Sequence, residues 1–419
     1  MAALSLRWRS IGQVLLVWAL CAGCRRFDVC GDAGDCPAVE EGVKGSIGTG
    51  GTSGSGGTRS EGGCTDGYED CDHTTLNGCE TDTSSAFAHC GACGQSCDGA
   101  CSAGSCVSFA ALVADRYGSS VTMGPTIVTT ATHAYYVADE SLATGLGIER
   151  VSLRDGSVEP LVEIGTWNTV DALALGASRL YVAADDRLFS VPHAGGELRA
   201  EEADGAQWVA AAGSTVAVVR DQRLFVRAGD RGPFVEVPEI ATVSAIAGES
   251  AIGVETLAIA ESFWEGDELR YRLWFRGEGG GLDLRASGSG EVVSMTLFRG
   301  RVYFEVEHGD RNDAYFVLDE DDAEPIEVPS MTGVTAWTPV KISWWYDEAS
   351  IVAAFGSPRS GLRFISLAST PFTAEWPTEG AISGLATVES ELLFFDGARR
   401  ALTRVNLEEL IAPRLLSTP

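Results

Sequence analysis

The segment Leu180-Tyr181-Val182-Ala183-Ala184-Asp185 carries the pattern that decides the fold: a short apolar strand with an aromatic residue, ending in an acid. Similar segments recur through the body of the chain. They cover residues 135–139, 180–185, 216–221, 257–261, 302–305, 342–347 and 392–396. Their terminal acids lie 36 to 49 residues apart, about 43 on average. A repeat of that length is typical of the four-stranded blade of a β-propeller.

The residues around each repeated segment complete the blade pattern. Alternating apolar and polar residues follow the segments, which predicts half-buried strands. These stretches are 147–153, 187–191, 223–227, 362–367 and 402–407. Small apolar residues precede the segments at 170–175, 208–212 and 382–386, and small side chains suit the crowded innermost strand of a blade. We therefore predict an all-β fold.

The ends of the body bear on how a ring of blades would close. Residues 109–115 are a candidate outer strand for the last blade, and residues 413–418 are a second candidate for the same place. A two-layer sandwich or two smaller β domains is the alternative fold, which the regular spacing disfavours. The aromatic strand with a trailing acid resembles the propellers of the YWTD, NHL and TolB-like type. This resemblance implies a β-propeller of about seven four-stranded blades over residues 107–419.

The cysteines divide the chain in two. All 12 lie between Cys21 and Cys106, and the body has none. Residues 64–106 contain few large apolar side chains, so a segment this small needs disulfides to hold it. The disulfide candidates are Cys30, Cys36, Cys64, Cys71, Cys79, Cys90, Cys93, Cys97, Cys101 and Cys106. The sequence leaves their pairing open.

Three short motifs mark this disulfide-rich module. They are Asp70-Cys71-Asp72, Asn77-Gly78-Cys79-Glu80 and His89-Cys90-Gly91-Ala92-Cys93-Gly94. Their spacing resembles a cysteine-rich module of secreted and surface proteins in myxobacteria and related bacteria. That resemblance implies a place at the cell surface and no particular chemistry.

The first residues predict export. Arg7 and Arg9 flank a short apolar run, 11–20, that ends in Leu20-Cys21-Ala22-Gly23-Cys24. This end resembles a bacterial lipoprotein signal, although Cys21 stands where leucine is usual. The resemblance implies removal of residues 1–23, lipidation of Cys24 and anchoring to the cell envelope at the outer membrane. The alternative is an ordinary cleaved signal with Cys24 in a disulfide.

Residues 24–63 follow the signal as a segment rich in glycine and serine, which predicts a flexible tether between the lipidated cysteine and the folded part. The expected organisation is therefore a signal peptide (1–23), a tether (24–63), a disulfide-rich module (64–106) and a propeller (107–419). The lipid would be the only membrane attachment.

The residues of the module also allow two metal sites, for zinc and for calcium, as alternatives to a purely structural role. His89, Cys90 and Cys93 have the local spacing of a zinc knuckle, but in an exported chain disulfides form first. Acidic side chains offer oxygen ligands to calcium, although their spacing fits no EF-hand loop. They are Asp66, Glu69, Asp70, Asp72, Glu80 and Asp82. We expect no metal site and no cofactor, with calcium as the alternative.

The sequence favours a non-catalytic role. The body has only His133, His193 and His308 as histidines and no recognised catalytic motif. The seven acids that end the repeated segments are interpreted as turn residues. A propeller lactonase, lyase or glycosidase would instead use acids at blade ends and calcium at the channel mouth. Candidate acids for it are Glu140, Asp186, Asp310 and Glu348.

The net charge of the chain limits the classes of partner that it can bind. The formal net charge of −29 repels nucleic acid and favours cationic partners. Trp344 and Trp345 are neighbours on an expected strand, so one of them would face outward and suit a sugar or protein ligand. We therefore expect a binding or scaffolding module for an unidentified protein or carbohydrate of the envelope, and the propeller enzyme is the alternative.

Overall fold

The structure is a computed structural model that describes most of the chain after residue 67. The described residues are 68–71, 79, 81–84, 87–97, 100–102, 104–115, 117–118, 126–139, 145–251, 254–277, 280–308, 313–319, 324–328, 331, 334–340, 350–355, 361–367, 373–378 and 381–416. All of them belong to one compact unit, Gly62–Pro419. None of the helices among them is both long and apolar enough to cross a membrane.

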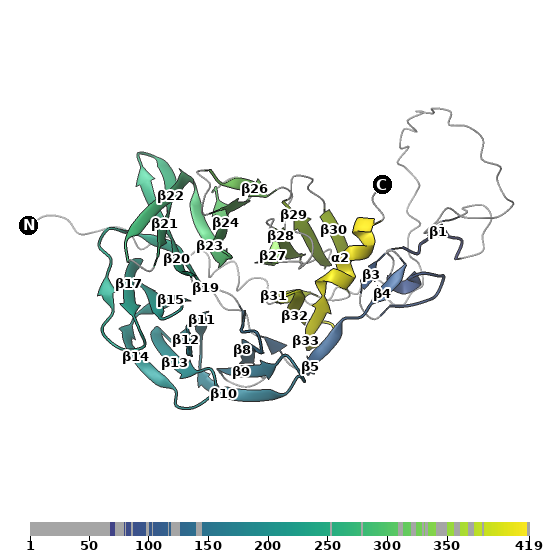
Figure 1. Ribbon diagram of the computed structural model, residues 1–419, viewed down its shortest axis with the longest axis horizontal. Helices are drawn as coiled ribbons and strands as arrows, with labels where there is room; N and C mark the ends of the chain where they lie inside the picture. Colours follow the sequence, from purple (N-terminus) through teal and green to yellow (C-terminus); the bar gives the residue numbers. More distant parts are fainter. Residues whose placement is uncertain are drawn as a thin grey trace, which may run out of the picture. The chain divides into compact units, whose positions relative to one another are not determined.

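The body is a propeller of seven sheets arranged around a common centre, as Figure 1 shows. The first sheet contains β7 (Ile127–Thr129), β8 (His133–Asp139), β9 (Leu146–Ser152) and β10 (Val158–Trp167), with β6 (Tyr117–Gly118) added beside β8. The second contains β11 (Val170–Leu175), β12 (Arg179–Ala184), β13 (Arg187–Pro192) and β14 (Arg199–Asp204). The third contains β15 (Ala206–Ala212), β16 (Thr215–Arg220), β17 (Arg223–Ala228) and β18 (Val235–Glu236).

The remaining sheets repeat this antiparallel order from the centre outward. The fourth contains β19 (Val243–Ala251), β20 (Val254–Glu265), β21 (Glu268–Arg276) and β22 (Leu282–Ser289). The fifth contains β23 (Glu291–Phe298), β24 (Arg301–Glu307), β25 (Ala314–Leu318) and β26 (Ile326–Val328). The sixth contains β27 (Val334–Pro339), β28 (Ser350–Phe355), β29 (Gly361–Ser366) and β30 (Thr373–Pro377). The seventh contains β31 (Ile382–Val388), β32 (Glu391–Asp396), β33 (Ala401–Asn406) and β5 (Ala110–Ala114).

The ring closes between the two ends of the body. β5 is the outermost strand of the seventh sheet and pairs with β33, so the strand predicted within residues 109–115 is confirmed. The fourth strand expected at 413–418 was wrong, because α2 (Leu407–Leu416) occupies most of that stretch. Asn406 caps this helix, and its Oδ1 accepts the N–H of Glu408 at 2.8 Å and of Glu409 at 3.2 Å.

One of the seven repeated segments was assigned wrongly. The second strand of the sixth sheet is β28 (Ser350–Phe355), which pairs with both β27 and β29. Residues 342–347 precede it and lie outside the described residues. The aromatic and acidic residues at 344–347 imitate the repeat. The chain instead buries Val352, Ala353 and Ala354, whose small side chains fit between two sheets.

The sheets pack face to face through small side chains near the centre. Ala172, Ala211, Ala258 and Ala353 are among these buried residues. The backbones of two sheets approach closely at Gly248 of β19, where an added Cβ atom would lie 2.2 Å from the carbonyl oxygen of Ala211 in the neighbouring sheet. Only glycine fits between these two backbones.

The cysteine-rich module consists of short elements. They are β1 (Tyr68–Glu69), β2 (Thr81–Asp82), the single-turn helix η1 (Phe87–His89), β3 (Ala100–Ser102) and β4 (Ser105–Val107). Three disulfides join described cysteines: Cys71–Cys93, Cys90–Cys101 and Cys97–Cys106. Cys79 is also disulfide-bonded. The module is therefore held by disulfides, as predicted.

Candidate binding face

The trailing acids gather at one face of the ring. In each antiparallel sheet the second strand ends at the face where the innermost strand begins, and we call this the top face. Asp185 and Asp221 occupy two-residue turns there. Their φ angles are +46° and +49°, and the residues that follow, Asp186 and Gln222, are also at positive φ. Two consecutive positive φ angles are typical of the tightest hairpins and favour aspartate or asparagine.

Several of these carboxylates hold the chain that enters each sheet. Asp185 Oδ1 accepts the N–H of Asn168 at 3.1 Å and of Thr169 at 2.9 Å, just before β11. Glu261 Oε1 accepts the N–H of Ala241 at 3.1 Å, just before β19. The interpretation of these acids as structural acceptors is confirmed at both positions. The turn assignment was wrong for Glu261, which is buried inside β20.

Asp396 closes its own turn. Its Oδ1 accepts the N–H of Ala398 at 3.0 Å and of Arg399 at 3.1 Å. Its carboxylate is nearly buried, at 7 % exposure, and Arg399 Nε lies 3.5 Å from Oδ2. These contacts fix the β32–β33 connection beside the strand that closes the ring.

The fifth sheet carries a different group of acids. Glu291 lies directly opposite Glu307 in the β23–β24 pair, and Glu305 and Asp313 lie beside them. We call these four residues the fifth-sheet acid group. Tyr315 Oη donates a 2.7 Å hydrogen bond to Glu305 Oε1. Glu305 was expected to end its strand, but β24 continues to Glu307.

Burial raises the pKa of two members of this group. For Glu291 the main cause is loss of solvent, and the charge of Glu307 adds to it. For Glu305 burial again contributes most, the hydrogen bond from Tyr315 acts in the opposite direction, and Asp313 and Glu307 add repulsion. The pKa of Tyr315 is raised by burial and by its contact with Glu305. Shifts of this kind gather at functional sites and also occur in structural networks.

We predict that Glu291→Gln raises the melting temperature at about pH 7.5 by roughly 2 °C. Because the pKa of Glu291 is higher in the folded chain, its contribution to stability is full below the unfolded-state pKa of about 4.3 and is lost as the pH rises through the folded-state pKa. Glutamine stays neutral, so the difference should shrink towards about pH 3.5. Thermal unfolding across this range measures it, with the exposed Glu327→Gln on β26 as control. A difference independent of pH would contradict the assignment.

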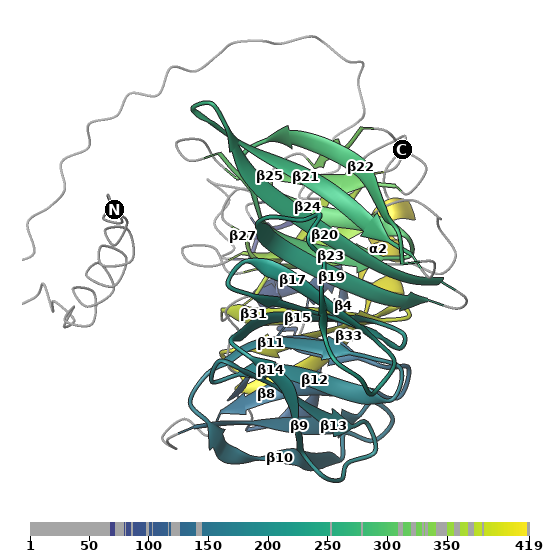
Figure 2. The same cartoon turned by 90° about the vertical axis from the view of Figure 1, so that its left-hand side faces the viewer.

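The fourth sheet has the longest hairpin of the ring. β20 has 12 residues and β21 has 9, whereas β12, β13, β16 and β17 have 6 each. Figure 2 shows these long strands from the side. The extra residues lie at both ends of β20. We call residues 262–271 the top hairpin, because β20 turns into β21 at the top face.

Trp264 stands on the top hairpin with 66 % of its surface exposed, the largest value among the exposed large apolar residues of the described chain. It lies opposite Leu269 in the strand pair. The hairpin beneath is well braced: the guanidinium of Arg272 lies 4.1 Å from the ring centre of Phe263 and 3.5 Å from Glu261. An exposed tryptophan on a braced hairpin is a typical contact residue for a ligand.

The tip of the top hairpin is acidic. Its sequence, Trp264-Glu265-Gly266-Asp267-Glu268, carries three exposed carboxylates. Glu265 and Glu268 pair with each other and Trp264 pairs with Leu269, so these two carboxylates and the indole lie on opposite sides of the hairpin. Arg270 lies 3.5 Å from Glu265 and 3.6 Å from Glu268. One cation among three anions leaves the tip negative, which favours a positively charged ligand.

The disulfides of the module exclude the candidate zinc site. Cys90 and Cys93 form disulfides with different partners, so neither offers a thiolate to zinc. Glu69 Oε2 accepts the N–H of Cys93 at 2.9 Å, and Asp82 Oδ1 accepts the N–H of Ser84 at 2.9 Å. One set of ligand atoms converges among the described residues, that of Glu69, Cys71 and Cys93, and the disulfide occupies both sulfurs.

The other expected site residues fall into two groups. Asp186 lies in the β12–β13 turn with φ +59°, and Cys71, Cys79, Cys90, Cys93, Cys97, Cys101 and Cys106 are all in disulfides. The rest lie outside the described residues. They are Cys24, Cys30, Cys36, Cys64, Glu140, Asp310, Trp344, Trp345 and Glu348. The sequence analysis missed Trp264, although the pair Phe263-Trp264 followed by Glu-Gly-Asp-Glu is a readable signal for an exposed turn.

Comparison with known proteins supports the fold. No protein-family model and no curated protein matches the sequence. Among solved structures, an oligogalacturonate lyase in complex with manganese matches with a TM-score of 0.50 and 12 % identity, over 72 % of this chain and 93 % of that one. The Cps50 (Swd1) β-propeller domain of Myceliophteria thermophila matches with a TM-score of 0.46 and 9 % identity, over 69 % and 99 %. TolB from Acinetobacter baumannii matches with 0.42 and 9 %, over 60 % and 64 %.

The sheets and disulfides of the structure define the class, a seven-bladed β-propeller that follows a disulfide-rich module. At 12 % identity the likeness to the lyase shows the fold alone, and a fold by itself leaves the function open.

Proposed function

We propose that the protein is a non-catalytic binding module whose contact element is the top hairpin. The observation that carries this proposal is Trp264, exposed at 66 % on the longest hairpin of the propeller. Aromatic anchors of this kind contribute most of the binding energy at interfaces. Several trailing acids of the same face are already engaged by backbone N–H groups, which fits a structural role for them.

The chemistry of the tip indicates the partner. Glu265, Asp267 and Glu268 make the tip of the top hairpin negative next to Trp264 in the chain, and the whole chain carries a net charge of −29. A lysine or arginine side chain would gain both a cation–π contact with Trp264 and attraction to these carboxylates. We therefore propose a protein partner with an exposed cationic segment. A neutral carbohydrate of the envelope is the alternative ligand.

Trp264→Ala is the test. Titration of the wild-type chain with a lysine-rich peptide should quench tryptophan fluorescence, and the variant should bind at least about tenfold more weakly. Its melting temperature should stay unchanged, because the side chain is mostly in solvent. Ile326→Ala, at 55 % exposure on β26, is the matched control and should bind normally. If Trp264→Ala and the wild type bind the peptide with equal affinity, the top hairpin is not part of the binding site.

A neutral oligosaccharide series in the same titration separates the two ligands. If the oligosaccharides bind and Trp264→Ala weakens their binding to the same extent, the ligand is a carbohydrate and the proposed cationic partner is wrong. Raising the salt concentration should weaken the binding of the cationic peptide and leave the binding of a neutral sugar unchanged.

The alternative function is a propeller enzyme of the lactonase, lyase or glycosidase type with a calcium site. The fifth-sheet acid group is the candidate for it, because burial raises the pKa of Glu291 and Glu305, although the ligand atoms of the group do not converge as those of a metal site do. A rise of the melting temperature with calcium, reversed by a chelator and lost in Glu291→Gln, would favour the enzyme.

We further propose that the protein is exported and anchored to the envelope, at the outer membrane, by a lipid on Cys24. The support is the sequence Leu20-Cys21-Ala22-Gly23-Cys24 after a short apolar run. The glycine-rich tether at 24–63 would then let the propeller reach a partner away from the membrane. The mass of the mature N-terminal peptide decides between an acylated Cys24 and an unmodified one.

A further inference from the structure

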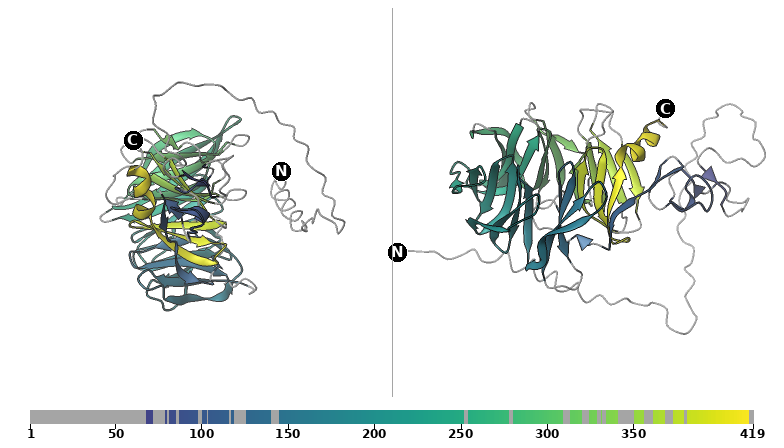
Figure 3. Two further views of the ribbon diagram at one scale, coloured as in Figure 1. Left: turned by 90° about the vertical axis from the view of Figure 1, so that its right-hand side faces the viewer. Right: turned by 60° about the horizontal axis from the view of Figure 1, so that its bottom comes forward.

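The cysteine-rich module lies directly against the place where the propeller ring closes. Only Val107, Ser108 and Phe109 separate Cys106 from the closing strand β5. β3 of the module contacts both α2 and β30 of the sixth sheet. The views in Figures 1 and 3 show α2 between the module and the last sheets of the ring.

The module and the closing region share one buried cluster. Ala100 and Val107 of the module, at 1 % and 7 % exposure, pack with Leu407, Leu410 and Ile411 of α2. Trp376 of β30 belongs to the same cluster. The module therefore contributes side chains to the apolar cluster that holds α2, together with the last two sheets.

Phe109 fixes the chain as it passes from the module to β5. Its ring meets that of Phe394 edge to face, with 5.5 Å between the centroids. Its carbonyl oxygen accepts a hydrogen bond from Arg399 Nη1 at 2.8 Å. Because β5 pairs with β33 alone, these contacts are part of what holds the closing strand in place.

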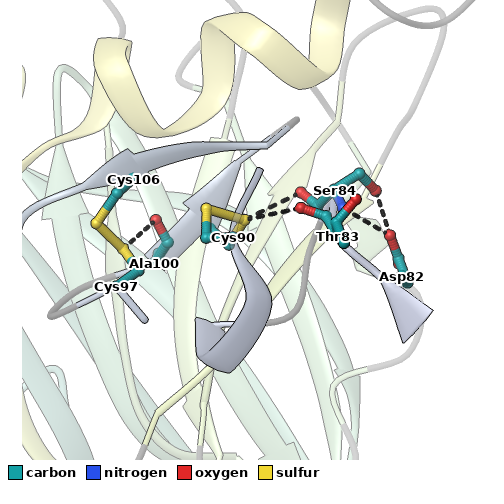
Figure 4. Close-up of a disulfide and its surroundings, with 8 residues drawn as sticks. Asp82, Thr83, Ser84, Cys90, Cys97, Ala100 and Cys106 are labelled. Carbon is teal, nitrogen blue, oxygen red and sulfur yellow. Dashed lines mark hydrogen bonds between the residues drawn. A yellow bond between two sulfur atoms is a disulfide. The ribbon is translucent and has the colours of Figure 1, made fainter. Parts of the chain in front are cut away.

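The module has almost no apolar core of its own. Among the described residues, its separate buried cluster consists of Cys90, Cys97 and Cys101, whose sulfurs all belong to disulfides. Figure 4 shows the Cys97–Cys106 bond on the strand that runs beside α2. Without its disulfides the module could not keep β3 and β4 in position against the helix.

We propose that the disulfide-rich module is an intramolecular clamp that holds the propeller ring closed. The Cys97–Cys106 and Cys90–Cys101 bonds keep Ala100 and Val107 against α2, and this contact secures β5 on β33. The stability of a propeller without cysteines thereby depends on disulfides outside it. The proposal concerns the fold and is independent of the ligand.

The test compares two disulfide deletions in the otherwise complete mature chain. Cys97→Ser with Cys106→Ser should lower the melting temperature by roughly 5–10 °C and raise amide exchange in β5 and β33 by at least about tenfold. Cys71→Ser with Cys93→Ser removes a bond at the other side of the module and should leave exchange in β5 and β33 unchanged. Equal exchange in β5 and β33 for wild type and both variants would overturn the proposal.

Reduction of the folded wild type tests the clamp even if a variant fails to fold. Dithiothreitol supplies two electrons and two protons per disulfide, converting each to two thiols while it is oxidised to its cyclic disulfide. Exchange should rise first in β5, β33 and α2 and later in β15 and β16 on the far side of the ring. A uniform rise, or none after the thiols have been counted, would also overturn the proposal.

Discussion

Glu201→Ala is expected to destabilise the protein by about 3–5 kcal/mol. Glu201 of β14 and Arg227 of β17 form an ion pair between the second and third sheets, with Nη1 and Oε2 2.7 Å apart. Their side chains are only 1 % and 2 % exposed. Removing the carboxylate leaves a guanidinium in the interior without its counter-ion.

The surroundings of this pair explain why water cannot replace the lost carboxylate. Arg227 lies 4.6 Å from the ring centre of Phe234 and 5.8 Å from that of Tyr181. Ser190 Oγ donates a 2.6 Å hydrogen bond to the other oxygen of Glu201. Arg199 lies 3.7 Å from Glu201, so the variant would also leave two cations close together.

Two controls separate burial from charge pairing. Glu236→Ala breaks the Arg223–Glu236 pair, which has the same 2.7 Å separation but side chains 61 % and 41 % exposed, and should cost about 0–1 kcal/mol. Glu201→Leu combined with Arg227→Met removes both charges and should recover most of the loss. Urea unfolding curves measure all three. A loss for Glu201→Ala no larger than that for Glu236→Ala would show that the buried pair contributes no more than a surface pair.

Phe394→Ala is the second large expected effect, about 3–5 kcal/mol. Phe394 of β32 is fully buried and packs against Phe109, Leu362 and Trp376 in the cluster that joins the last sheets to the module. The truncation removes apolar contacts and leaves a cavity beside the closing strand. Val235→Ala, at 63 % exposure on β18, should change stability by about 0.5 kcal/mol or less.

A double-mutant cycle relates this result to ring closure. Phe109→Ala alone and together with Phe394→Ala should reveal a coupling of about 0.5–1.5 kcal/mol, because the two rings meet edge to face. Additive losses would mean that Phe394 acts through its other neighbours and not through the segment that leads into β5.

The period of the sequence was enough to predict the propeller, whereas it left two candidates for the closing strand, 109–115 and 413–418. Stretches such as 170–175, 187–191 and 216–221 combine local strand propensity with a regular spacing, and each became the expected strand of its sheet. The second strand of the sixth sheet was predicted wrongly, because composition cannot rank the small residues of β28 above the aromatic residues at 344–346. That choice depends on the space between neighbouring sheets, which no local pattern records.

The candidate site was harder to predict for a similar reason. Trp264 resembles the other aromatic residues of second strands, and its exposure follows from the extra length of β20 and β21. The pairing of the cysteines depends on three-dimensional placement, so the Cys90–Cys101 and Cys97–Cys106 bonds could not be chosen from spacing. The structural role of Asp185 and Asp396 at turns was predictable, because only a few residue types suit such turns.

The pairing of β5 with β33 determines when the ring can close during synthesis of the chain. Arg399 and Phe109, which meet at this closure, are 290 residues apart in the chain. β5 is synthesised before any other strand of the ring, yet its only strand partner, β33, is the last of the described strands. Contacts between such distant residues form slowly, because most of the chain must be ordered first. During synthesis the early sheets therefore stack as an open arc, and β5 keeps an unpaired edge until residues 401–406 arrive.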